Sequence, residues 1–458
     1  MGIGRSSARR GRRGRPSRTL GFSRRPVKRA RRHAPAHAQF QNGYANGYRE
    51  GVQFGLQGYD TLFEGTSIII PTYNQLELLK QCLGSIMDNT DRPYEMIVVD
   101  NASTDGTADY LRKLGGTVRY RVLDQNRGFA GAINAGLMMA KGQTLLLLNT
   151  DTLVTENWLD NLLVCLHSDE RIGMVGPVTN YSSGDQQIKV PYSDIGEMPA
   201  FAKSFNVSNA ALWHRTDRLV GFCLLFRREL FQQVGYFDER FVFGSFEDDD
   251  YNIRVRLLGK SLVVAADTFI HHFGSPSIKA LGDRFISINE QNERYFLDKW
   301  HLWNEWIHQT HLYLSRSPEG LKGMVSLFPS RIAVQGIGAG VYWIDRGERR
   351  PVEGVLSFQA VRVSQTDLKQ WPLGEPITAA EAERLWLGGE RDSADVVALP
   401  DGTLYHLEDG RARRIVGPAA MEGWNLHQKK RTVLQAEKLA EWEPGLPIVA
   451  PPLLRQVL

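Results

Sequence analysis

Short apolar runs alternate with amphipathic stretches from Thr66 onward. "TSIIIP", "YEMIVVD", "TVRYRVLD", "QTLLLLN" and "RIGMVGPV" have the length and composition of strands, whereas "QLELLKQCLGSIMDNT" repeats its apolar residues at helical spacing. The same spacing predicts helices over residues 129–140 and 156–168. Strands that alternate with helices are typical of βαβ units, so we expect an α/β domain whose mostly parallel, Rossmann-like sheet is flanked by helices.

Polar residues stand where three of these strands end. Thr72, Asp100 and Asp151 each follow an apolar run, and ligands of open parallel sheets bind beyond the carboxyl ends of the strands. A carboxylate such as Asp100 can accept hydrogen bonds from a base or ribose, and Asp151 can hold a hard divalent cation that neutralises a diphosphate. The pattern predicts a site for a phosphorylated, sugar-bearing ligand.

Four carboxylates, Glu247 to Asp250, open a further predicted helix. The helix dipole favours one or two acids in a first turn, so part of this cluster has a purely structural explanation. Four adjacent carboxylates repel one another, which favours one group whose pKa is poised for chemistry. His271 and His272 follow the next apolar segment. A lone histidine there would be a core residue, but beside these acidic groups His272 becomes a candidate metal ligand.

Composition sets the class of protein. The chain has 458 residues, of which 42% are hydrophobic and 23% charged, as in globular proteins of two or three domains. Its longest apolar runs are far shorter than the roughly 20 residues of a membrane-spanning helix, and no apolar stretch follows the basic N-terminus as in a secretory signal. We therefore expect a cytoplasmic protein. Its three cysteines lie in apolar segments and are expected to be reduced: Cys82, Cys165 and Cys223.

The net charge of +4 conceals an asymmetry. Residues 1–49 contain 14 Lys or Arg and no acidic residue, so the rest of the chain holds 41 basic and 51 acidic residues. We expect residues 1–60 to be a disordered basic tail and a Gly/Tyr-rich linker. The tail is either a solvated arm or a ligand for a polyanion, including the anionic inner face of a membrane. This Gly/Tyr-rich segment repeats glycine every four residues, so it is either a linker or an element of self-association into a homo-oligomer.

The C-terminal third follows a different pattern. "GVYWIDRGERRPV" at 340–352 and "TLYHLEDGRARRIV" at 403–416 alternate like hairpins around a turn, and each is followed by a related "WPLGEPI" or "WEPGLPI" segment. We expect two diverged copies of one β-hairpin module over residues 325–458, with a binding or assembly role, after an α/β domain over residues 61–315.

Six fragments together resemble one family. "SIIIPTYNQLELLKQCLGSI", "IVVDNASTDGT", "NRGFAGAINAGLMMAKGQTLLLLNTD", "GFCLLFRRELFQQVGYFDERF", "FEDDDYNIRVRLLG" and "HFGSPS" occur in the order found in inverting family 2 glycosyltransferases with the GT-A fold. The rhamnosyltransferase-like and galactofuranosyltransferase-like branches are the most similar. The resemblance covers roughly residues 66–300, about half of the chain.

The resemblance implies a role for each matching residue on the donor side. The nucleotide-sugar donor, a UDP- or dTDP-sugar, would be bound by a set of strand-end and loop residues: Pro71, Thr72, Tyr73, Asp100, Asn126, Arg127, Gly128, Asn149, Asp151 and Glu247. Asn149 to Asp151 match an Asp-X-Asp motif, with Asn149 in place of the first acid. This substitution leaves fewer negative charges for a metal.

The resemblance also implies the chemistry. Asp151 and His272 would bind Mn²⁺ or Mg²⁺, with His271 as the competing choice, and Asp248 would be the general base of an inverting displacement. The acceptor would be a hydroxyl of a glycan or glycoprotein. The polar segment 180–218, which holds Tyr181, Tyr192, Trp213 and His214, is expected to be an acceptor lid or a surface loop with buried anchors. The alternative is a catalytically silent carbohydrate-binding or scaffold protein, and specific nucleic-acid binding is not expected.

Overall fold

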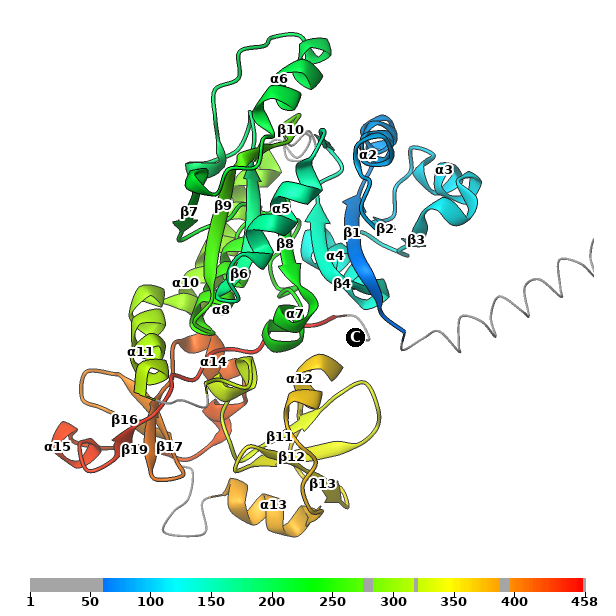
Figure 1. The fold of residues 1–458 in the computed structure, drawn as a ribbon. Helices are drawn as coiled ribbons and strands as arrows, with labels where there is room; N and C mark the ends of the chain where they lie inside the picture. Colours follow the sequence, from blue (N-terminus) through cyan, green and yellow to red (C-terminus); the bar gives the residue numbers. More distant parts are fainter. Residues whose placement is uncertain (1–60, 275–282, 317–319, 388–395, 456–458) are drawn as a thin grey trace, which may run out of the picture. The chain divides into compact units, whose positions relative to one another are not determined.

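The computed structural model describes residues 61–274, 283–316, 320–387 and 396–455. The basic tail and linker expected over residues 1–60 lie outside the described residues. From Leu62 onward the chain forms one unit, and Figure 1 labels most of its helices and strands.

An eight-stranded sheet forms the centre of the first half of this unit (Figure 1). Its strands, in the order β3-β2-β1-β4-β8-β6-β9-β7, are β1 Phe63–Thr72, β2 Tyr94–Asp100, β3 Arg119–Val122, β4 Gly142–Leu148, β6 Ile172–Val178, β7 Trp213–Thr216, β8 Cys223–Arg227 and β9 Ser261–Phe269. Strands β3, β2, β1 and β4 are parallel neighbours, as are β6 and β9. Strand β8 runs antiparallel between β4 and β6, and β7 is an antiparallel edge. The expected α/β fold with a mostly parallel sheet is confirmed.

Helices cover both faces of the sheet because successive strand residues point to opposite sides. In β1, Ile69 belongs to the buried cluster that includes residues of α4, α7 and α8, whereas Ile68 and Ile70 belong to the cluster that includes residues of α2, α3 and α5. The helices are α2 Leu76–Asn89, α3 Thr107–Lys113, α4 Gly128–Met139, α5 Trp158–His167, α6 Met198–Phe205, α7 Arg228–Val234, α8 Glu247–Leu257, α10 Asp283–Trp300 and α11 Trp303–Arg316. All three cysteines are buried and free, as predicted. No helix among the described residues is long and apolar enough to cross a membrane.

Two five-stranded sheets follow, and they share one topology. Their orders are β14-β11-β12-β13-β15 and β19-β16-β17-β18-β20, and in each the two inner pairs are antiparallel and the two outer pairs parallel. Each central hairpin turns on two residues with positive φ, Arg346–Gly347 and Asp409–Gly410. Their strands are β11 Ile332–Gln335, β12 Val341–Asp345, β13 Glu348–Glu353, β14 Val361–Arg362, β15 Ile377–Thr378, β16 Val396–Ala398, β17 Leu404–Glu408, β18 Arg411–Arg414, β19 Arg431–Val433 and β20 Glu443–Pro444.

The short helices of this part are α12 Gln365–Gln370, α13 Ala379–Trp386, α14 Pro418–Gly423 and α15 Ala436–Leu439. The part shares a hydrophobic core with the preceding helices, because Ile253 and Leu257 of α8 and Trp306 of α11 belong to the same buried cluster as Trp343 and Trp424. The first half of the unit and the two C-terminal sheets are therefore packed together by apolar contacts.

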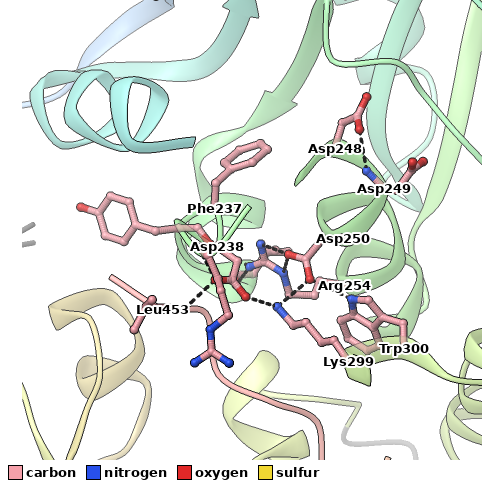
Figure 2. A network of polar contacts seen from close by, with 12 residues as sticks. Phe237, Asp238, Asp248, Asp249, Asp250, Arg254, Lys299, Trp300 and Leu453 are labelled. Carbon is pink, nitrogen blue, oxygen red and sulfur yellow. Dashed lines mark hydrogen bonds and ion pairs between the residues drawn. The ribbon is translucent and has the colours of Figure 1, made fainter. Parts of the chain in front are cut away.

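A buried ion network ties α8 to distant parts of the chain (Figure 2). The Lys299 ammonium lies 2.6 Å from both the Asp238 and Asp250 carboxylates, and Arg254 lies 2.8 Å from Asp250. The side chains of all four residues are at most 1% exposed. The backbone N–H of Leu453 donates to Asp238 at 3.0 Å. Two cations and two anions thus balance, and the C-terminal segment is attached to them.

Lys299→Met should therefore destabilise the protein. The substitution leaves two buried carboxylates with one cation, and breaking a buried ion pair costs about 3–5 kcal/mol. The measurement is the free energy of unfolding in denaturant. Lys203→Met is the matched control, because the Lys203 side chain is 71% exposed in its ion pair with Glu156. A loss for Lys299→Met no larger than that of the control would contradict this role of the network.

Candidate active site

The ends of β1 and β2 form one wall of the site. Thr72 and Asp100 are register partners at these ends and both are buried. The Ser103 backbone N–H donates to Asp100 Oδ1 at 2.9 Å, but Asp100 Oδ2 and Thr72 Oγ1 have no hydrogen-bond partner among the described residues. A buried polar atom left unpaired costs about 1–3 kcal/mol. Both atoms are suited to a ligand that offers hydroxyl or N–H groups.

The neighbouring residues of β1 are placed at the same edge. The carbonyl of Pro71 accepts a hydrogen bond from Thr150 Oγ1 at 2.6 Å, which joins the end of β1 to the loop after β4. The Tyr73 side chain, one residue beyond β1, is 40% exposed. It can therefore contact a ligand that lies over the strand ends.

Asn101 organises the loop that contains Asn126, Arg127 and Gly128. Its Nδ2 donates to Asn126 Oδ1 at 2.9 Å, and its Oδ1 accepts from the Arg127 backbone N–H at 2.8 Å. The Gly128 N–H also donates to Asn126 Oδ1. The loop is thereby held beside Asp100. Sequence reasoning missed Asn101, although it directly follows Asp100 in "VVDNAS".

Asp151 and His272 meet across a short ribbon. Strand β5 (Thr152–Leu153) pairs with β10 (His271–His272), and His272 Nε2 lies 3.3 Å from Asp151 Oδ2. His272 Nδ1 lies 2.8 Å from the carbonyl oxygen of Tyr181. Because a carbonyl can only accept, Nδ1 carries the proton, and Nε2 of the neutral ring turns its lone pair toward the carboxylate. Together the two atoms can bind a divalent cation.

His271 points the other way, as alternation along a strand requires. Its Nδ1 lies 2.7 Å from the Tyr192 hydroxyl. Burial, with a smaller effect of His272, lowers its pKa to about 4. Of the two histidines, His272 is thus the one that lies beside Asp151.

The oxygen and nitrogen atoms around Asp151 fit a divalent cation. Asn149 Oδ1 is buried and has no hydrogen-bond partner among the described residues. Within those residues no three His, Cys, Asp or Glu side chains gather as one metal centre. Mg²⁺ is commonly held by one or two carboxylates together with substrate phosphates and water. Asp151 and His272 therefore suit a cation that completes its coordination with ligand oxygens.

The first turn of α8 carries Asp248 (Figure 2), and its side chain is buried. The Gly221 backbone N–H donates to Asp248 Oδ2 at 2.9 Å. Burial, and next the negative charge of Asp249, raise the Asp248 pKa from 3.8 to about 6. Burial and the charge of Asp248 likewise raise the pKa of Glu247 well above its usual range. Asp248 is therefore adapted to exchange a proton close to neutral pH.

The other two carboxylates of the cluster have different surroundings. Asp249 pairs with Arg218 at 2.5 Å at a partly exposed position. Asp250 points toward Lys299 and Trp300 (Figure 2), and although burial alone would raise its pKa, Arg254 and Lys299 lower it. The cluster thus divides into Glu247 and Asp248 on one side and a structural Asp250 on the other, a division that sequence alone could not give.

A single segment, Gly221–Phe222, connects the separate parts of the site. Gly221 binds Asp248, and the Phe222 carbonyl accepts from the Asn149 backbone N–H at 2.9 Å. The Phe222 ring stacks on His272, with centroids 5.4 Å apart. The residues expected to bind metal and the expected base are therefore positioned by adjacent residues before β8.

A pocket of about 470 Å³ is lined mostly by the segment 180–218. Its lining residues are Ser183, Gly184, Asp185, Arg215, Thr216, Asp217, Arg218 and Val220. Arg218 also contacts Asp248 at 4.0 Å, so the pocket adjoins the acidic turn of α8. Two aromatic residues of the segment are anchors, because Tyr192 binds His271 and Trp213 Nε1 donates to Asp267 at 2.8 Å. The Tyr181 side chain is 46% exposed.

Comparison with known proteins places this site in a family. Residues 67–235 match the model "Glycosyl transferase family 2". The chain is 29% identical over 230 residues to protein y4gI of Sinorhizobium fredii, covering 47% of this chain and 25% of that protein. It is 27% identical over 214 residues to the glycosyltransferase GlyG of Streptococcus pneumoniae, covering 44% of this chain and 68% of that protein.

Among solved structures, GalNAc-T7 with UDP, GalNAc and Mn²⁺ is similar over 58% of this chain and 53% of that chain, with 17% identity and a TM-score of 0.40. The chain spans only a quarter of the length of y4gI. The matched residues 67–235 nevertheless include Asp100 at the end of β2 and Asp151 in the loop after β4. Residues 67–235 therefore form a glycosyl transferase family 2 domain, the family that the six sequence fragments resemble.

Proposed function

We propose that the protein transfers a sugar, with inversion, from a UDP- or dTDP-sugar to a hydroxyl of a glycan or glycoprotein. Asp248 is the general base, and Asp151 and His272 hold Mn²⁺ or Mg²⁺. The nucleotide lies over Pro71, Thr72, Tyr73 and Asp100, and the donor diphosphate lies near Arg127. The pocket beside Arg218 receives the acceptor.

One observation carries this proposal. The Gly221–Phe222 segment holds a buried carboxylate with a raised pKa on one side and the Asn149–His272 region on the other. Glycosyl transfer with inversion needs both features, a base for the acceptor hydroxyl and a group that stabilises a departing diphosphate. A scaffold protein has no need for either of them at the same edge of the sheet.

Each residue then has a defined task. Asp248 accepts the proton of the attacking hydroxyl, and the Gly221 N–H fixes the orientation of its carboxylate. Asp100 Oδ2 and Thr72 Oγ1, which have no hydrogen-bond partner among the described residues, form hydrogen bonds to the nucleotide and so orient it. A divalent cation, when bound, neutralises charge on the departing diphosphate. Arg127, whose Nε is buried without a hydrogen-bond partner among the described residues, adds a positive charge nearby.

A donor screen tests the proposal. Purified protein is mixed with UDP-, dTDP- and GDP-sugars, with and without Mn²⁺ or Mg²⁺, and nucleoside diphosphate release and donor binding are measured. We expect metal-dependent release from a UDP- or dTDP-sugar. If no donor binds or reacts, while glycans bind through residues beyond 320, the protein is a carbohydrate-binding scaffold instead.

The activity should depend on pH through Asp248. A general base works only when deprotonated, and the Asp248 pKa is raised to about 6. Activity should therefore be full above this pH and fall about tenfold for each pH unit below it. The measurement is kcat/KM against pH at constant ionic strength. An acidic limb near the ordinary aspartate value of 3.8 would contradict the assignment.

A further inference from the structure

The loop that enters α8 has an unusual backbone. Four consecutive residues have positive φ: Phe243 at 61°, Gly244 at 136°, Ser245 at 91° and Phe246 at 71°. Only glycine adopts such values without a steric penalty, and each other residue costs about 1–3 kcal/mol. The surrounding structure must therefore hold Phe243–Phe246 in place.

Asn292 provides that restraint. It lies on α10 and is 1% exposed. Its Nδ2 donates to the carbonyl oxygens of Val242, Gly244 and Ser245 at 3.0, 3.2 and 3.2 Å, and its Oδ1 accepts from the Val242 N–H at 3.0 Å. One amide thus contacts four backbone groups, and its two N–H donors are shared among the three carbonyl oxygens. An amide is the neutral side chain that offers both donors and an acceptor in one plane.

The same helix supports the loop and α8 at later positions. The Phe296 ring contacts the Phe246 ring, with centroids 5.3 Å apart. Lys299 and Trp300 then bind the carboxylate of Asp250 (Figure 2). Successive turns of α10 therefore fix the loop and the helix that follows it.

The Phe243–Phe246 loop lies between the Asn126–Gly128 loop and the acidic first turn of α8. On one side a Cβ added to Gly128 would come within 3.0 Å of the Phe243 nitrogen, so the Asn126–Gly128 loop and the Phe243–Phe246 loop are in close contact. On the other side Phe246 is followed directly by Glu247 and Asp248. The conformation of Phe243–Phe246 consequently sets the separation between the Asn126–Gly128 loop and Asp248.

We propose that Asn292 is a positioning residue: it fixes the Phe243–Phe246 loop and thereby aligns Asp248 with the donor held near Arg127. The inference rests on the proposed function. Asn292 lies outside the residues that match the family model, 67–235. It acts through the loop and touches no reacting atom.

Asn292→Ala tests the proposal, with Gln291→Ala as the matched control because Gln291 is the exposed preceding residue on α10. For Asn292→Ala we expect kcat to fall by roughly 10-fold to 10²-fold, because small misplacements of reacting groups have effects of this size. The dissociation constant of the nucleoside diphosphate, measured by calorimetry, should stay close to that of wild type. Amide hydrogen exchange should accelerate in peptides covering 242–246.

Three outcomes would overturn the inference. One is an active wild type whose kcat is unchanged by Asn292→Ala. Another is a loss of kcat that is explained entirely by a smaller fraction of folded protein, with faster amide hydrogen exchange throughout the chain. The third, decisive even if wild type proves inactive and the proposed function fails, is unchanged exchange over 242–246. If Asn292→Ala does not fold, Phe296→Leu removes the ring contact to Phe246 and keeps an apolar side chain against the neighbouring core, and the same readouts apply to it.

Discussion

Asp248→Asn should lower kcat by about 10²–10⁴ while donor binding is retained. Asparagine keeps the size of the side chain and can still accept the Gly221 hydrogen bond, but it cannot take a proton from the acceptor hydroxyl. The raised pKa of Asp248 and its burial are typical of a general base. The measurements are kcat at saturating donor and acceptor, and the dissociation constant of the donor by calorimetry.

Asp249→Asn is the matched control for this variant. Asp249 is the next residue, but it pairs with Arg218 and is more exposed. We expect it to retain most of the activity. Because the Asp249 charge helps to raise the Asp248 pKa, its removal should shift the acidic limb of the pH profile to lower pH. If Asp249→Asn were inactive and Asp248→Asn active, the base would be misassigned.

The sequence predicted the parts of the fold that local pattern determines. Continuous apolar runs became β1, β2, β4 and β6, and the polar residues after them, Asp100 and Asp151, lie at strand ends as expected. The strand β8 shows what local sequence does not predict. Its run "CLLFR" is as apolar as the others, and nothing in it states that the strand lies antiparallel between β4 and β6. That position depends on pairing between distant segments.

The parts of the site that the sequence did not predict are long-range contacts. Arg218 meets Asp249, and Asn292 meets the loop before α8, across many residues of chain. Side-chain direction was equally hidden in the acidic cluster, where one helical turn places Asp248 toward Gly221 and Asp250 toward Lys299. Composition and periodicity carry no information about such partners.

Asp151→Ala should abolish the metal dependence of the reaction. Asp151 is the carboxylate that faces His272, and no third His, Cys, Asp or Glu joins them among the described residues to compensate for its loss. A catalytic cation contributes several kcal/mol of transition-state stabilisation, so kcat should fall on the order of 10²-fold or more. The same variant should lose Mn²⁺ binding in the presence of nucleoside diphosphate, measured by electron paramagnetic resonance.

The two histidines give this prediction its sharpest control. His272→Gln removes the nitrogen that lies 3.3 Å from Asp151, and it should weaken Mn²⁺ binding by about tenfold or more, which corresponds to roughly 1.4 kcal/mol. His271→Gln changes a residue that binds Tyr192 on the opposite side of β10, and Mn²⁺ affinity should remain. The reverse result would assign the metal to His271. Equal Mn²⁺ affinity in Asp151→Ala, His272→Gln and wild type would show that the cation does not bind between Asp151 and His272.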